Sequence, residues 1–122
     1  MSHRLDENDV LWAPQAVVQE QIASILTAWG MKPEHVAATA EVMADADACG
    51  IDTHGISMLP PYDDRRRRNV ITLDTDINVV TETPTTALID AGGGLGYVPS
   101  LLATKMCIDK AKVMGMAAVA VR

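Results

Sequence analysis

The fold is decided by residues 86–121, which have the sequence TALIDAGGGLGYVPSLLATKMCIDKAKVMGMAAVAV. Two short runs rich in apolar and branched residues, 86–90 and 117–121, stand at its ends and are typical of β-strands. Between them, residues 99–114 begin with a proline and stop at Gly115, a punctuation typical of an α-helix. A strand, a helix and a second strand in this order predict a βαβ unit with parallel strands.

Two earlier segments carry the same punctuation, with a proline at the start and a glycine after the end. Residues 14–29 stop at Gly30, and residues 33–49 stop at Gly50. Proline suits the first helical turn, where its missing N–H would be unpaired, and glycine suits the left-handed residue after a helix. The connecting turn is short, so we expect an antiparallel helix pair. Asp47 is among the acidic residues of the second helix that are expected to face solvent.

The elements between these helices and the βαβ unit are shorter. Residues 77–81 (INVVT) are rich in branched residues and predict a β-hairpin with residues 86–90. A short helix is expected to begin near Pro60 or Pro61. The fold class is therefore α+β: an antiparallel helix pair, a short helix, a β-hairpin and a βαβ unit.

The expected organisation is an N-terminal tail over residues 1–13 and one domain over residues 14–122. The last strand is apolar at every position, so we expect cover on both of its faces. Ligands of open α/β sheets gather at the carboxyl ends of parallel strands, and the sequence stops at one such end, Arg122. We therefore expect the N-terminal part of a larger, incomplete fold.

Composition and charge exclude several classes of protein. A length of 122 residues with 48% hydrophobic residues fits one globular domain. The net charge of −6 disfavours nucleic acid or an anionic membrane as a partner. The N-terminus has no apolar secretion segment and no stretch is long enough to span a membrane, so we expect a cytoplasmic protein. Cys49 and Cys107 are expected to be buried free thiols.

The glycine run GGGLG (92–96) invites comparison with nucleotide-binding turns. It does not satisfy the GxGxxG pattern, because Tyr97 or Pro99 stands where the third glycine belongs. The favoured interpretation is a flexible turn between strand and helix, with close approach of a cofactor or another chain as the alternative.

A charged run, DDRRRR (63–68), follows the two prolines. Aspartates and arginines four positions apart form helical ion pairs, so a solvated, self-paired helix is the favoured interpretation. The alternatives are binding of a substrate carboxylate and a contact between subunits. No metal site is predicted, because Asp52 and His54 have no further ligand at a suitable spacing.

The motif CGIDTHG (49–55) places one histidine, His54, in a loop after a helix. Histidine is the side chain best suited to exchange a proton near neutral pH, and loops commonly display catalytic groups. A single loop histidine is also common as an ordinary polar residue. Composition and spacing leave both interpretations open.

Four motifs then occur in a distinctive order: THG at 53–55, LPPY at 59–62, DAGGGLGYVPS at 90–100 and AAVAVR at 117–122. In this order the chain resembles the malate/L-lactate dehydrogenase family, which includes ureidoglycolate dehydrogenase and diketogulonate reductase. The resemblance extends over nearly the whole chain from residue 14. It implies a nicotinamide-binding fold that is not a Rossmann domain, with this chain as its N-terminal part.

The resemblance also implies an activity, which is hydride transfer between NAD or NADP and the carbon of a 2-oxo or 2-hydroxy acid. His54 is then the proton donor or acceptor, with Thr53 and Arg65 expected to bind substrate. Many members have an arginine four residues after the motif histidine, where this chain has Met58. Either Arg65 or a neighbouring arginine takes that role, or the substrate differs.

Family members are typically homodimers, and in them a second histidine, in an N-S-x-H-F-G motif, follows the strand equivalent to residues 117–121. That motif and the main cofactor-binding segments do not occur in this sequence. On this hypothesis the chain alone is inactive. The alternative hypothesis is a non-enzymatic domain that keeps only a dimerisation or interaction surface. Sequence encoded after Arg122 would separate the two.

Overall fold

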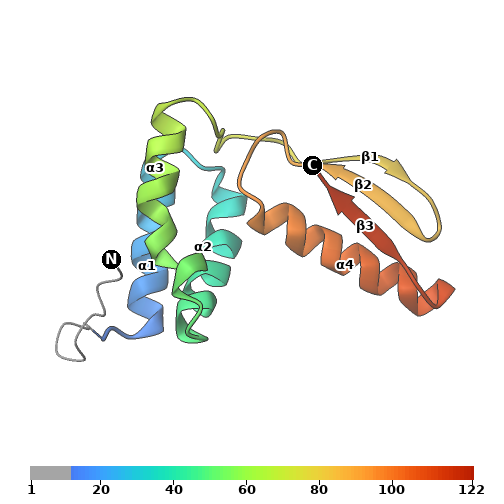
Figure 1. Ribbon diagram of the computed structural model, residues 1–122, viewed down its shortest axis with the longest axis horizontal. Coiled ribbons are helices and arrows are strands. Elements are labelled where there is room, and N and C mark those ends of the chain that lie inside the picture. Colours follow the sequence, from blue (N-terminus) through green and yellow to red (C-terminus); the bar gives the residue numbers. More distant parts are fainter. Residues whose placement is uncertain (1–11) are drawn as a thin grey trace, which may run out of the picture.

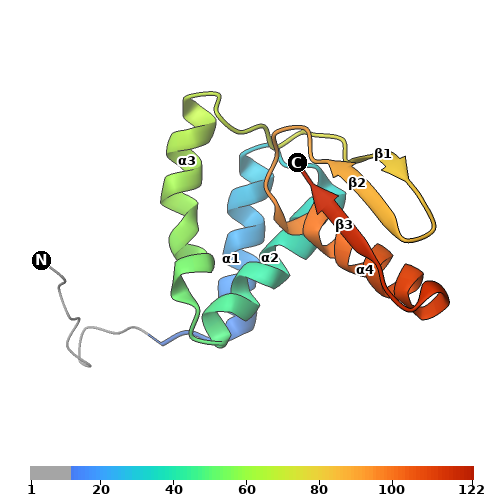
Figure 2. The ribbon, with the colours of Figure 1, turned by 45° about the vertical axis from the view of Figure 1, so that its right-hand side comes forward.

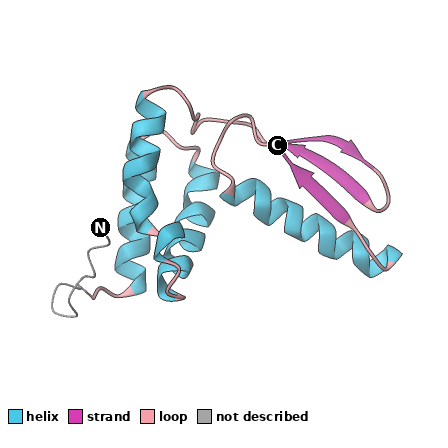
Figure 3. Ribbon diagram, viewed as in Figure 1, coloured by secondary structure: helices cyan, strands magenta, loops and turns pink. Residues whose placement is uncertain are grey.

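The computed structural model describes residues 12–122, which form a helical part and a sheet-containing part side by side (Figure 1). Figure 3 shows the separation of the two, with helices alone at one end and the sheet, with a helix along it, at the other. The predicted tail, residues 1–13, lies almost entirely outside the described residues. The elements are α1 (Gln15–Ala28), α2 (Pro33–Ala48), α3 (Leu59–Arg67), β1 (Asn78–Glu82), β2 (Thr86–Asp90), α4 (Tyr97–Met114) and β3 (Ala118–Val121).

The predicted helix ends are confirmed. Gly30, Gly50 and Gly115 have φ angles of +85°, +75° and +85°, the left-handed conformation that a residue without Cβ adopts at little cost. The start of α2 at Pro33 is also confirmed, whereas α1 and α4 start one and two residues away from the predicted positions. The largest shift is in α4, which begins at Tyr97, so that Pro99 stands inside its first turn where an N–H has no helical partner.

The core lies between α1 and α2, which run in opposite directions as predicted (Figure 1). Ile22, Leu26 and Met43 are completely buried there. Removing each such side chain from water contributes roughly 1.5–3 kcal/mol. Because the chain has no phenylalanine, aliphatic and methionine side chains fill this space.

The sheet contains the predicted hairpin and βαβ unit. Its strand order is β1-β2-β3, with β1 and β2 antiparallel and β2 and β3 parallel. The register pairs Val79 with Ile89 and Leu88 with Ala120, and a bulge interrupts β1 at Val80. Side chains of β2 alternate in burial, and Ile89 is completely buried. The helix α4 lies along β3 and one face of the sheet (Figure 2).

Two burial predictions are wrong. Cover on both faces was expected for the last strand, but β3 is mostly exposed and Val121 keeps 38% of its surface in contact with solvent. The physical reason is that α4 covers only one face of the sheet. Cys49 is exposed rather than buried, because it stands at the solvent-facing end of α2, and Cys107 is half-buried.

The glycine run forms a turn that packs against its own chain. Gly92 donates its N–H to the Asp90 carboxylate at 2.8 Å, and the carbonyl of Gly93 accepts the N–H of Thr72. A Cβ on Gly94 would lie 2.6 Å from the Thr75 hydroxyl oxygen. The favoured interpretation of this run as a turn is thus supported, and the chain that approaches its backbone is the 72–76 segment.

Candidate active site

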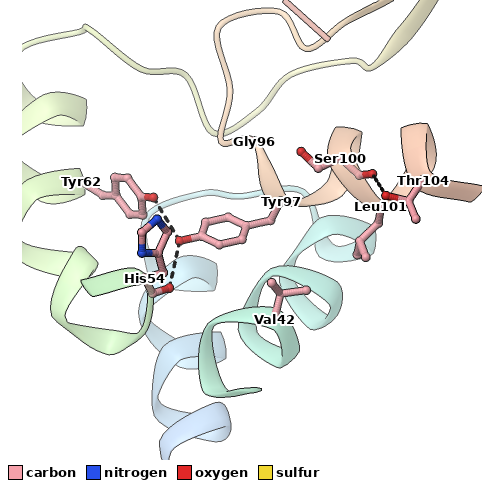
Figure 4. A pocket seen from close by; sticks show the side chains of 8 residues that line it. All are labelled: Val42, His54, Tyr62, Gly96, Tyr97, Ser100, Leu101 and Thr104. Atoms are coloured by element: carbon pink, nitrogen blue, oxygen red, sulfur yellow. Dashed lines mark hydrogen bonds between the residues drawn. The ribbon is translucent and has the colours of Figure 1, made fainter. Parts of the chain in front are cut away.

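His54 ends a 3-10 turn, Asp52–His54, that connects α2 to the segment leading into α3. Its side chain is exposed and borders a cavity of about 360 Å³ (Figure 4). The cavity lies where α2, the His54 turn, α3 and the start of α4 meet, and it is lined by Val42, His54, Tyr62, Gly96, Tyr97, Ser100, Leu101 and Thr104. Its wall therefore combines two apolar side chains, four hydroxyl groups and one imidazole.

Two neighbours hold His54. The hydroxyl oxygen of Thr53 lies 2.9 Å from the Nδ1 of His54, and the phenol of Tyr97 donates to the His54 backbone carbonyl at 3.4 Å. A partner at Nδ1 selects the orientation of the ring and commits Nδ1 to Thr53. Among the described residues no hydrogen bond to Nε2 is present, so this nitrogen is available to exchange a proton.

The glycine of the THG motif has a steric role. A Cβ on Gly55 would lie 1.7 Å from Oδ1 of Asp47, which is far inside van der Waals contact. The same carboxylate accepts the backbone N–H of Ile56 at 2.8 Å. Asp47 thus fixes the chain directly after His54, and only glycine fits beside it. The expectation that Asp47 faces solvent is wrong, because it is half-buried under this turn.

Two tyrosines of the cavity wall meet at their hydroxyl groups. The hydroxyl oxygens of Tyr62 and Tyr97 are 3.0 Å apart, and the rings meet edge to face with centroids 6.4 Å apart (Figure 4). Burial, followed by the hydrogen bond with Tyr62, raises the pKa of Tyr97 far above its ordinary value. No role was predicted for these tyrosines from the sequence. The only signal for them was their place in the motifs LPPY and DAGGGLGYVPS.

The arginine run is largely self-paired, as its helical spacing predicted. Asp63 bonds Arg66 and Arg67 at 2.6 Å each, and Asp64 bonds Arg68 at 3.1 Å. Burial of Asp63 opposes ionisation, but its hydrogen bonds with Arg67 and Arg66 outweigh it and lower the pKa of that carboxyl. The guanidinium of Arg66 also lies 4.9 Å from the centroid of a tryptophan ring, that of Trp29. The carboxylates of Asp63 and Asp64 thus pair with these three arginines.

Arg65 is the remaining arginine of the run. It is exposed, lies outside the wall of the His54 cavity, and forms no ion pair with any residue in 12–122. The structure thus brings Thr53 and His54 together but leaves Arg65 apart from them. Met58, at the position where many family members have arginine, packs against the helical core.

The described residues show no cluster of side chains that could hold a metal ion. No three His, Cys, Asp or Glu side chains gather in the part of the chain that the structure describes. Of the helices between residues 12 and 122, none has the length and apolarity required to cross a bilayer.

Comparison with known proteins identifies the family. The sequence profile described as malate/L-lactate dehydrogenase matches residues 14–122. L-sulfolactate dehydrogenase of Methanocaldococcus jannaschii is 39% identical over 101 residues, which are 83% of this chain and 29% of that protein. Ureidoglycolate dehydrogenase (NAD(+)) of Escherichia coli K12 is 29% identical over 92 residues, 75% of this chain and 26% of that protein.

A solved structure agrees with the sequence comparison. Malate dehydrogenase of Pyrococcus horikoshii OT3 superposes with a TM-score of 0.84 at 32% identity, covering 98% of this chain and 34% of that one. The chain thus spans between a quarter and about a third of the length of these relatives. It belongs to the malate/L-lactate dehydrogenase family.

Proposed function

We propose that this chain is the N-terminal part of an NAD- or NADP-dependent dehydrogenase of small 2-hydroxy acids, with His54 as the proton donor and acceptor. The observation that carries the proposal is the placement of His54. Its ring borders a 360 Å³ cavity, its Nδ1 is held by Thr53 at 2.9 Å, and its Nε2 has no bonded partner among residues 12–122. The names of the relatives, which include malate, sulfolactate and ureidoglycolate dehydrogenases, support the proposed substrate class.

The proposed chemistry needs one proton transfer at the oxygen of the reacting carbon. When the 2-oxo acid is reduced, the protonated imidazole of His54 donates a proton to the oxygen that becomes the hydroxyl. When the 2-hydroxy acid is oxidised, the neutral imidazole accepts that proton. The nicotinamide supplies or accepts the hydride, and we assign no residue of 12–122 to its binding.

Thr53 and Arg65 have separate proposed roles in substrate binding. The Thr53 hydroxyl keeps the imidazole in one orientation, and from its place beside His54 we propose that it also contacts the substrate. Arg65 lies three residues after Tyr62 on α3, so both project from neighbouring positions of one helical face. Its guanidinium is exposed and carries a full charge that Asp63 and Asp64 do not neutralise. We propose it as the partner of the substrate carboxylate.

A second function has an observation in its favour, the exposure of apolar side chains on the sheet-containing part. They include Val79, Val80, Val113, Met114 and Met116. Under the alternative hypothesis these residues form an interaction or dimerisation surface and the chain has no enzymatic role. A homodimer is also compatible with the dehydrogenase hypothesis, so oligomeric state alone does not separate the two.

The test begins with the reading frame beyond the codon of Arg122. The dehydrogenase hypothesis expects a continuation with an N-S-x-H-F-G-like motif, and its absence contradicts the hypothesis. In the protein encoded by the whole frame, His54→Ala is expected to lower turnover of 2-oxo acids roughly tenfold or more, because general acid–base catalysis is lost. The absorbance of reduced nicotinamide measures turnover across a panel of acids.

The matched control is His35→Ala, a histidine of the first turn of α2 that does not line the His54 cavity. It is expected to retain full turnover. Circular dichroism of both variants shows whether each keeps its helices. Equal turnover in His54→Ala and the parent protein makes His54 an ordinary loop residue and contradicts its proposed role.

A further inference from the structure

The two tyrosines of the cavity form a directed chain of hydrogen bonds that ends on His54. A backbone carbonyl can only accept, so the bond between Tyr97 and the carbonyl of His54 uses the phenolic proton of Tyr97. The oxygen of Tyr97 is then an acceptor for Tyr62, whose hydroxyl oxygen is 3.0 Å away. The order of donors is therefore Tyr62 to Tyr97 to the His54 carbonyl (Figure 4).

From this geometry we propose that Tyr97 is a positioning residue for His54 and that Tyr62 orients Tyr97; the inference rests on the proton-transfer role proposed above for His54. Neither phenol is bonded to the imidazole, which Thr53 holds. Their action is on the backbone of the His54 turn. Displacement of a reacting group by about 1 Å costs roughly 100-fold in rate, so a bond that fixes this backbone acts on turnover.

The position of Tyr97 in the fold gives the chain of bonds a second consequence. Tyr97 is the first residue of α4, directly after the glycine turn, whereas His54 and Tyr62 belong to the helical part. The cavity wall is built from both parts, with Ser100 and Thr104 supplied by α4 (Figure 4). The two hydrogen bonds thus join the parts at the cavity and set where α4 stands relative to His54.

The protonation of Tyr97 agrees with its role as a donor. Burial of the phenol is the largest of the causes that raise the pKa of Tyr97 above its ordinary value of 10.0. The phenolic proton is therefore retained throughout the neutral range in which histidine exchanges protons. If Tyr97 were partly ionised in this range, the ionised fraction of the molecules would have no hydrogen bond to the His54 carbonyl.

The test uses Tyr97→Phe and Tyr62→Phe, each of which removes one oxygen and keeps the ring. Thr104→Val is the matched control, because it removes a hydroxyl from the same cavity wall that is bonded only within α4. In the 122-residue chain, the ¹³C resonance of the His54 carbonyl and the ¹⁵N resonance of Gly55 report the bond to Tyr97. Both are expected to shift in Tyr97→Phe, to shift less in Tyr62→Phe and to stay fixed in Thr104→Val.

Kinetics of the protein encoded by the whole frame give the second readout. Tyr97→Phe is expected to lower kcat roughly tenfold with little change in KM, because the substrate groups still bind while the proton is transferred from a displaced ring. Tyr62→Phe is expected to lower kcat by a smaller factor. Thr27→Val, which removes a hydroxyl that is bonded within α1 and lies outside the cavity wall, is expected to leave kcat unchanged. In the double variant, kcat should fall by less than the product of the two single effects, because both substitutions break the same series of hydrogen bonds.

The outcomes separate this inference from the proposed function. If His54→Ala loses turnover while Tyr97→Phe keeps it, the inference is wrong and the proposed function stands. If His54→Ala keeps turnover, the proposed function fails and the inference with it. Unchanged His54 and Gly55 resonances in Tyr97→Phe also overturn the inference, whatever the turnover. If circular dichroism shows that Tyr97→Phe is unfolded, Tyr62→Phe decides by the same two readouts.

Discussion

Replacing Gly55 by alanine adds a methyl group that clashes with the carboxylate of Asp47. The added Cβ would lie 1.7, 2.0 and 2.3 Å from Oδ1, Cγ and Oδ2 of that side chain. The backbone of Gly55 has a negative φ of −96°, so the obstacle is the neighbour rather than a left-handed conformation. Asp47 must therefore rotate away, and it then loses the N–H of Ile56, which it accepts at 2.8 Å.

The magnitude follows from that hydrogen bond. A charge-assisted bond between a carboxylate and a backbone N–H contributes about 1.5–3 kcal/mol to the free energy of unfolding. For a domain of this size the loss corresponds to a fall in Tm of roughly 6–12 °C. Asp47→Ala loses the same bond but also removes the clash. The double variant should therefore cost about as much as Asp47→Ala alone, not the sum of the two single costs.

The assay is urea unfolding of the four proteins of this cycle, followed by circular dichroism. The slope of the free energy against urea is expected to be the same in all four, because the surface exposed on unfolding does not change. The control is Gly96→Ala. Gly96 has a helical φ of −73° and open space around a Cβ, so this substitution is expected to be neutral or stabilising by roughly 0.4–1 kcal/mol.

Two results would refute this reasoning. The first is a Gly55→Ala variant as stable as the parent, which would mean that the carboxylate moves aside at no cost. The second is additivity, in which the double variant loses the sum of the two single losses. Additivity would show that Asp47 and Gly55 act on stability independently and that the THG glycine is needed for another reason.

Three further predictions concern ionisation and charge. The pKa of Tyr97 is raised by burial and then by a hydrogen bond. The contribution of this tyrosine to the free energy of unfolding is therefore complete below about pH 10 and is lost as the pH rises. In urea unfolding, Tyr97→Phe should lose less stability at alkaline pH than the parent protein. The pKa of Asp90 is lowered, and the hydrogen bond from the backbone N–H of Gly92 is the largest cause. The ionised carboxylate therefore stabilises the fold above the ordinary pKa of 3.8, and this contribution is lost as the pH falls. Asp90→Asn should make the free energy of unfolding less dependent on pH in the acid range. In the protein encoded by the whole frame, Arg65→Gln should raise the KM for 2-oxo acids roughly tenfold, because a charged hydrogen bond to the substrate is lost. The control, Arg68→Gln, loses only a surface ion pair and should leave the KM unchanged. An unchanged KM in Arg65→Gln would remove this arginine from the site.

Local signals in the sequence were enough to predict the elements. Gly30, Gly50 and Gly115 mark helix ends because a positive φ is a property of one residue, independent of the rest of the fold. The hairpin and the βαβ unit were predicted for a similar reason, since short branched runs and their connections lie close together in the chain. His54 was predicted as the candidate residue, and Thr53 as its neighbour, from a motif of three residues.

What could not be predicted depends on partners that are distant in the sequence. Asp47 resembles any solvent-facing acid of α2, because its partner, the N–H of Ile56, lies nine residues later across a turn. Tyr62 and Tyr97 are 35 residues apart and meet only after α4 has docked. The exposure of β3 was also not predicted. The apolar sequence of a strand indicates that burial is favourable, but it does not indicate which other segments pack against the strand.

The strand β3 has a consequence for handling the chain in solution. Within residues 12–122 it pairs with β2 on one side, so the N–H and C=O groups on its other side form an open edge of a sheet. An apolar edge strand is a template on which a second chain can add a strand, which leads to aggregation. The short length of four residues and the net charge of −6 oppose such growth. The chain should therefore be most soluble in low salt at neutral pH, and it should associate as salt screens its charge or as the pH approaches 4.8.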